Sequence, residues 1–195
     1  MKIAQLAGSH AFLTVHGYQP VGNNRFLVAP ANTAVREPVW PAGFTIKSLA
    51  ELGDLEPVVQ ASNNCYADMW GHRENTEPLT VAYLQETMTR FADSYDPAGI
   101  FVLFAPSGDV VGLCFSRVEK GTTLRVLDSP GVAPRYRHLS LQRPLVQLCM
   151  KRLQQRAAGE YHLHTYGDFT EAVQIYEQLG FVLKPEKHLI EYFLT

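Results

Sequence analysis

The chain has few cysteines, almost no excess charge and no long hydrophobic run, and each of these shortages excludes a class of protein. Its 195 residues include three cysteines, Cys65, Cys114 and Cys149, an odd number that is widely spaced. Such spacing matches neither a disulfide framework nor a CxxC metal site. Unpaired thiols are typical of reducing compartments, so we expect a cytoplasmic protein.

The excess of one sign of charge over the other is also small. Lysine and arginine total 17 against 19 aspartate and glutamate residues, a formal net charge of −2. Binding to the phosphate backbone of nucleic acid requires a basic surface, so no nucleic-acid partner is expected. Residues 1–15 have an apolar bias that Gln5, Ser9 and His10 interrupt. This segment is too short to span a membrane and makes a poor signal-peptide core, so no membrane partner is expected either.

Hydrophobic residues, in contrast, are plentiful. They make up 46% of the chain, enough to bury a core, and the length suggests one domain with some residues left over. Residues 29–43 contain three prolines and no periodicity, which indicates an extended linker. We therefore divide the chain into an N-terminal arm (1–28), this linker (29–43) and a main domain (44–195).

The arm carries a weak internal repeat. Residues 11–21 can be laid over residues 175–185, with Gly17 on Gly180 and an aromatic residue after each glycine. The arm can thus be the remnant of a preceding repeat of the main domain, or it can be an ordinary N-terminal hairpin. Because it is too short to form a core, we expect it to pack on the main domain or on the partner subunit of a homodimer.

Apolar periodicity and turn residues predict the elements of the main domain. The expected fold is α+β, with one mixed, mostly antiparallel sheet of about seven strands flanked by about four helices. Its elements, in order, are a strand at 44–49, helices at 51–70 and 79–91, three antiparallel strands within 99–132, a helix at 141–158, a strand at 161–167, a helix at 169–179 and two closing strands.

Two short segments are the most informative. Residues 132–145, VAPRYRHLSLQRPL, combine a strand end, a turn and a helix start, where backbone N–H groups converge and can bind a phosphate. Arg135, Arg137 and Arg143 add positive charge to this turn, although it can also be a solvated basic turn. Residues 175–181, IYEQLGF, read as a helix that ends at a glycine and leads into a strand.

Together these segments resemble the GNAT superfamily of acyl-CoA-dependent N-acyltransferases. That family has Gln or Arg, two variable residues, Gly, one variable residue and then Gly or Ala in the turn, and Arg137, Ser140 and Gln142 occupy these positions. The YEQLGF segment matches the C-terminal helix and turn of the family, and residues 63–78 are similar to a mycothiol-synthase-like branch. The resemblance extends from about Phe44 to the C-terminus. It implies transfer of the acetyl group from acetyl-CoA to a primary amine within a ternary complex, without a metal.

The resemblance also implies a cofactor site in the turn. Ser140 and Gln142 are larger than the family's residues, and left-handed backbone angles would cost a residue with a Cβ roughly 1–2 kcal/mol. Right-handed helical angles would accept either side chain, and we expect binding to be retained. The alternatives are a catalytically inactive CoA-binding or regulatory module, and an interaction protein assembled through its sheet edges and arm. The predicted cofactor-binding residues are Val132, Arg137, His138, Leu139, Ser140, Leu141, Gln142 and Arg143.

Tyr176 is the first catalytic candidate, because the resemblance implies that this tyrosine protonates the departing thiolate. It can equally be a core aromatic residue. No general base stands out: Asp128 is the second catalytic candidate, and Glu119 could also act through water, but both can be exposed strand-end charges. The acceptor is expected to contact Trp70, His72 and Glu119.

Two further patterns have simpler explanations. Asp168 is expected to cap the last helix. His162 and His164 alternate on a strand and so share a face, which is the geometry of two metal ligands. No third ligand has matching spacing, so no metal is expected.

Overall fold

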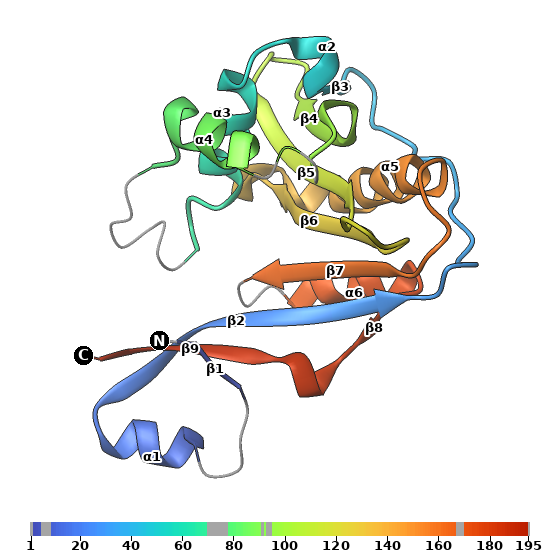
Figure 1. Ribbon diagram of the computed structural model, residues 1–195. Coiled ribbons are helices and arrows are strands. Elements are labelled where there is room, and N and C mark those ends of the chain that lie inside the picture. The colour runs from blue at the N-terminus through green and yellow to red at the C-terminus, as the bar shows by residue number, and fades with distance from the viewer. Residues whose placement is uncertain are drawn as a thin grey trace.

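A computed structural model describes residues 2–4, 9–69, 78–90, 92, 95–166 and 170–194 (Figure 1). Its strands form one sheet of nine strands in the order β1-β9-β2-β7-β6-β5-β4-β3, and β8 pairs with β2 outside this path. The strands are β1 (Lys2–Ala4), β2 (Tyr18–Ala29), β3 (Thr45–Ser48), β4 (Ile100–Phe104), β5 (Val110–Val118), β6 (Arg125–Val132), β7 (Tyr161–Tyr166), β8 (Val182–Leu183) and β9 (Leu189–Leu194). The helices are α1 (Ser9–Val15), α2 (Leu49–Leu52), α3 (Glu56–Cys65), α4 (Val81–Arg90), α5 (Gln142–Gln154) and α6 (Thr170–Gln178), with short 3₁₀ helices η1 (Pro97–Gly99), η2 (Pro134–Leu139) and η3 (Pro185–Lys187).

The predicted α+β class is confirmed, but the predicted numbers of strands and helices were too low. The single helix expected at 51–70 is divided, because Gly53 adopts left-handed angles (φ 67°) and ends α2 before α3 begins. A capping box between Ser48 and Glu51 starts α2. Within the described ranges, no helix is long and apolar enough to cross a membrane.

Helices cover the sheet from both sides. On β5, Leu113 packs in a cluster with residues of α3 and α4, whereas Cys114 packs in a cluster with residues of α5 and α6. Successive side chains of a strand point to opposite faces, so the two helix pairs lie on opposite faces of the sheet (Figure 1). Leu127, Leu163 and Leu27 extend the α5–α6 core across β6, β7 and β2.

The N-terminal segment is part of the sheet. β2 lies between β7 and β9 and pairs antiparallel with both, which confirms that this segment packs on the main domain. α1 is followed by Gly17 (φ 81°), as α6 is followed by Gly180 (φ 93°), and an aromatic residue comes after each glycine. The origin of the arm as a repeat, and the division at residues 28 and 43, stay predictions.

The centre of the sheet contains its parallel pair, β6 and β7. Arg125–Asp128 pair with Tyr161–His164, and the pairing ends there although β6 continues to Val132 and β7 to Tyr166. The two ribbons diverge beyond this point in Figure 1. The turn that follows β6 leads directly into α5, so a helix start lies next to the divergence.

Candidate active site at the end of β6

The turn after β6 is anchored at both ends. Val132 is 3% exposed and Leu141 is fully buried, and both belong to one apolar cluster. Between them His138, Leu139 and Ser140 are exposed. No described side chain caps the start of α5. Of the N–H groups in its first turn, that of Arg143 donates to the carbonyl oxygen of Ser140 at 3.3 Å, and Pro144 has none. The backbone donors that this helix start can offer to a phosphate are therefore the N–H groups of Leu141 and Gln142.

Ser140 departs from helical geometry. Its backbone angles are φ 55° and ψ 28°, and it has the one positive φ among the described non-glycine residues. Its N–H donates to the carbonyl oxygen of Arg137 at 3.1 Å. The helical alternative for this position is therefore wrong, and Ser140 bears the left-handed strain that glycine avoids in the family's motif.

Replacing Ser140 by glycine should stabilise the protein by about 0.5–1 kcal/mol, because relief of the strain exceeds the added entropy of the unfolded chain. Ser140→Ala is the matched control, since alanine keeps the Cβ and the strain. Urea unfolding measures both variants. A glycine variant no more stable than the alanine variant would show that the angles at this position are not strained.

Arg137 is directed toward α3. Its Nη1 donates to Asp68 Oδ2 at 2.6 Å and its Nη2 to the carbonyl oxygen of Cys65 at 2.9 Å. Its Nε donates to the carbonyl oxygen of Val132 at 3.0 Å. The guanidinium thus ties the turn to the C-terminal end of α3, and Asp68 already balances its charge.

The other two arginines of the turn also have protein partners. Arg135 pairs with Asp109 and donates to the hydroxyl of Tyr136, and Arg143 donates to Gln178. The arginine side chains that were expected to face a pyrophosphate therefore already bind other side chains of the protein. The expected role of the turn residues in cofactor binding stays a prediction, and backbone amides are its firmest basis.

Gln142 connects the end of β6 with α6. Its Nε2 donates to the carbonyl oxygen of Pro130 at 2.8 Å and to the hydroxyl oxygen of Tyr176 at 2.9 Å. Pro130 lies on the part of β6 that is not paired with β7. A pantetheine arm that forms hydrogen bonds with this strand edge must therefore share the carbonyl oxygen of Pro130 with Gln142, or displace Gln142 from it.

Tyr176 is both packed and hydrogen-bonded. The side chain is 1% exposed, and its ring lies 6.4 Å from that of Phe181. Burial raises the pKa of Tyr176, nearby Cys114 raises it further, and hydrogen bonds with Gln142 and Thr165 act in the opposite direction. The phenol is therefore protonated at neutral pH, as a proton donor must be, so burial in the core and an acid role are compatible.

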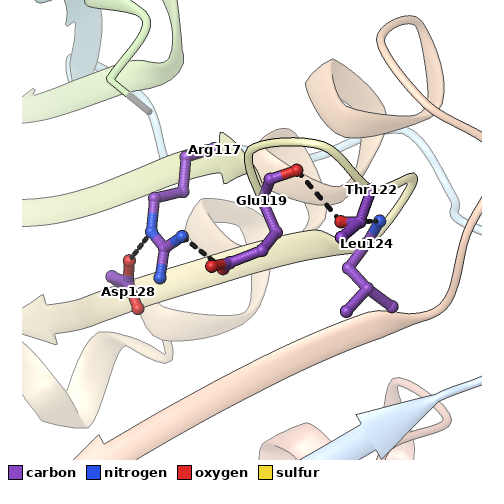
Figure 2. A network of polar contacts seen from close by, with 5 residues as sticks. All are labelled: Arg117, Glu119, Thr122, Leu124 and Asp128. Carbon is purple, nitrogen blue, oxygen red and sulfur yellow. Dashed lines mark hydrogen bonds and ion pairs between the residues drawn. The ribbon is translucent and has the colours of Figure 1, made fainter. Parts of the chain in front are cut away.

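Asp128 and Glu119 are brought together by a residue that the motifs did not reveal. Arg117 lies between them in Figure 2, with its Nε 2.6 Å from Asp128 Oδ2 and its Nη1 2.7 Å from Glu119 Oε2. The sequence signal that could have indicated this network is the occurrence of opposite charges on two strands expected to be neighbours. Both carboxylates are thus ion-paired.

The backbone of Glu119 shapes the β5–β6 turn, because its carbonyl oxygen accepts from Thr122 Oγ1, which in turn accepts from the N–H of Leu124 (Figure 2). Glu119 also lines a cavity of about 260 Å³ with Arg152, from the C-terminal half of α5, and Arg156, just after α5 ends. This position is at the other end of α5 from the phosphate turn, so Glu119 and the turn do not form one site.

Several predicted residues cannot be placed. Trp70 and His72 lie outside the described residues, and so does Asp168.

His162 and His164 do share a face, where the ring of Phe26 lies with its centroid 5.1 and 4.8 Å from theirs. Across the described part of the chain, no three histidine, cysteine, aspartate or glutamate residues are grouped as metal ligands.

Comparison with known proteins gives a family match. Residues 61–181 match the model of the acetyltransferase (GNAT) family. A mycothiol acetyltransferase of Arthrobacter sp. (strain FB24) is 31% identical over 171 residues, which cover 85% of this chain and 51% of the relative. One of Streptomyces bingchenggensis is 29% identical over 80% of this chain and 49% of the relative. The chain spans about half the length of the curated relatives it matches.

Solved structures share the fold. A GCN5-related N-acetyltransferase from Sphaerobacter thermophilus superposes with a TM-score of 0.70 at 20% identity, covering 98% of this chain and 57% of the other. A tandem GNAT protein from the clavulanic acid biosynthesis pathway has a TM-score of 0.59 at 15% identity, covering 97% and 58%. Both alignments include nearly the whole chain and little more than half of the other protein.

Proposed function

Because the chain belongs to the acetyltransferase (GNAT) family, we propose that it transfers the acetyl group of acetyl-CoA to a primary amine. The observation that carries the proposal is the divergence of β6 and β7 next to the start of α5. The unpaired edge of β6 can pair with the amides of the pantetheine arm as it would with a peptide. The N–H groups of Leu141 and Gln142, at the start of α5, can then bind the pyrophosphate.

The reaction needs an amine without its extra proton, a stabilised oxyanion and a proton for the departing thiolate. Direct attack by the amine nitrogen on the thioester carbon requires no covalent enzyme intermediate. Tyr176 is the residue we assign as proton donor to the thiolate. Its protonated phenol and its bond to Gln142, which also bonds β6 at Pro130, support this role.

The relatives give a starting point for the acceptor. They are named mycothiol acetyltransferases, so an amine related to mycothiol is the first acceptor to test. Because this chain spans only about half the length of these relatives, its acceptor can differ from theirs. Small metabolites and peptide amines are therefore also acceptors to test.

A second candidate function is a CoA-binding module without turnover. Three observations favour it: the strained Ser140, the Gln142 side chain on the strand edge, and the engagement of Asp128 by Arg117. Each of these could weaken cofactor binding or remove a base without affecting the fold.

Calorimetric titration with acetyl-CoA, followed by a thiol-release assay with a panel of amines, separates these functions. We expect acetyl-CoA to bind in the micromolar-to-millimolar range of typical substrates and at least one amine to release CoA thiol. Binding without thiol release would establish the non-catalytic module. Absence of binding would overturn both functions.

A further inference from the structure

One face of the sheet carries polar groups at the point where β6 and β7 diverge. His164 is opposite Asp128 in the last paired position of the two strands, and its side chain is exposed. Phe26 of β2 is paired with His164 on the other side, with the rings 4.8 Å apart and nearly perpendicular. Asp128, His164 and Phe26 thus share one face across three neighbouring strands.

This face is the one opposite α5 and α6. Leu127, Leu163 and Leu27, each adjacent in sequence to one of these three residues, point into the core beneath α5 and α6. The alternation of a strand therefore directs Asp128, His164 and Phe26 to the other side. A molecule on that side can reach the divergence of β6 and β7 without displacing the core.

Asn24 adds an unsatisfied donor to the same face. It lies on the side of β2 that carries Phe26, and it is paired with Tyr166 of β7. Its Nδ2 is buried and has no hydrogen-bond partner among the described residues. Buried polar groups are nearly always hydrogen-bonded, so this amide is a donor that an oxygen of a bound molecule can satisfy. As a diagonal neighbour, Asn24 is about 7–8 Å from His164.

Partial burial, more than any neighbouring charge, favours the neutral form of His164. Partial burial lowers the pKa of His164, Asp128 of β6 raises it, and Arg117 of β5, His162 of β7 and Lys187 of η3 lower it further. The imidazole at pH 7 therefore has a lone pair that can accept a proton. Asp128, in contrast, is ion-paired with Arg117.

We propose that the amine acceptor binds over this face, that His164 accepts the proton of its ammonium group, and that Asn24 donates to an oxygen of the acceptor. This proposal rests on the proposed acetyl transfer, and it identifies the base of that reaction and the chemical class of the acceptor. That class is a primary amine with a hydroxyl or carbonyl oxygen a few bonds from the nitrogen. Asn24 belongs to the N-terminal segment, outside residues 61–181, so the site draws on a part of the chain that the family match does not include.

The protons balance as follows. An N–H bond of the ammonium breaks and its proton passes to His164. The nitrogen lone pair then bonds to the thioester carbon, and the C–S bond breaks as Tyr176 gives its phenolic proton to the CoA sulfur. A second nitrogen proton restores the phenol of Tyr176. His164 returns the first proton to solvent, leaving an amide and CoA thiol.

His164→Gln, with His162→Gln as matched control, tests the base. We expect a fall in kcat of about 10²–10⁴-fold for His164→Gln and little change for the control. Wild-type kcat/KM should fall as the pH drops below the lowered pKa of His164, since the protonated ring cannot accept a proton. In His164→Gln, activity should instead rise toward high pH with the free-amine fraction of the acceptor. Equal turnover and equal pH profiles in all three proteins would overturn the role of His164.

Asn24→Ala tests the acceptor class with two amines of similar shape, L-alaninamide, which has a carbonyl oxygen, and sec-butylamine, which has none. We expect wild-type kcat/KM to favour L-alaninamide, and the variant to reduce that preference about tenfold, the value of one hydrogen bond to a polar substrate group. An unchanged preference, or turnover of sec-butylamine alone, would overturn the role of Asn24. A wild-type chain that binds acetyl-CoA but acetylates no amine would overturn the proposed transfer and this site together, whereas an active wild type with unaffected variants overturns the site alone.

Discussion

Tyr176→Phe should lower kcat about 10²–10⁴-fold while the Kd for acetyl-CoA changes little, because the phenol donates a proton only as the C–S bond breaks. The side chain is almost fully buried, and phenylalanine fills the same volume. Gln142 keeps its bond to Pro130 in the variant, so the strand edge should stay intact. Steady-state kinetics and calorimetry measure the two quantities.

Tyr161→Phe is the matched control. Tyr161 is also fully buried on the α5–α6 face, and its hydroxyl bonds the carbonyl oxygen of Met150 at 3.5 Å. Both variants lose buried hydrogen bonds of the hydroxyl, each worth about 0.5–1.5 kcal/mol of stability. Only Tyr176→Phe should lose turnover. Equal kcat in the two variants would reduce Tyr176 to a packing residue.

Arg137→Ala should lower the free energy of unfolding by about 2 kcal/mol and weaken acetyl-CoA binding. The variant loses the bonds to Asp68, Cys65 and Val132, and with them the connection between the phosphate turn and α3. A loss of this size lowers Tm by about 4–8 °C in a chain of this length. Thermal unfolding and calorimetric titration measure the effects.

Arg135→Ala and Arg143→Ala serve as controls on the same turn. Their partners, Asp109 and Gln178, are exposed side chains, and exposed pairs contribute little to stability. If Arg137 acted only as a positive charge for the pyrophosphate, all three variants would weaken binding alike and leave Tm unchanged. A lower Tm confined to Arg137→Ala would support its role in positioning the turn.

Most elements of the main domain could be predicted because their signals are local. The apolar stripe of α5 and the glycine after α6 identified these helices within a few residues of their bounds. The three strands β4, β5 and β6 were separated by recognisable turns. The division of the helix expected at 51–70 was missed, because a glycine within an apolar helical pattern does not by itself indicate a break.

The candidate site was less predictable, because its contacts join distant residues. The conformation of Ser140 depends on how η2 meets α5, so spacing in the motif could not distinguish left-handed from helical angles. The role of Arg117 required the register of β5 against β6, which places Asp128 within reach of its guanidinium. Arg137 was recognised as part of the turn, but its partner Asp68 is 69 positions away.

Residue order and composition were therefore sufficient for the α+β class and the order of the main elements, since hydrophobic periodicity and turn residues act over a few positions. The family was indicated by the resemblance of two short motifs, which also lie within the sequence itself. The insertion of β2 between β7 and β9, the pairing of Asp128 with Arg117, and the bond between Gln142 and Tyr176 were decided only when the chain folded. Hydrogen bonds of that kind depend on the register of strands and the packing of helices that are far apart in sequence, and no local pattern encodes them.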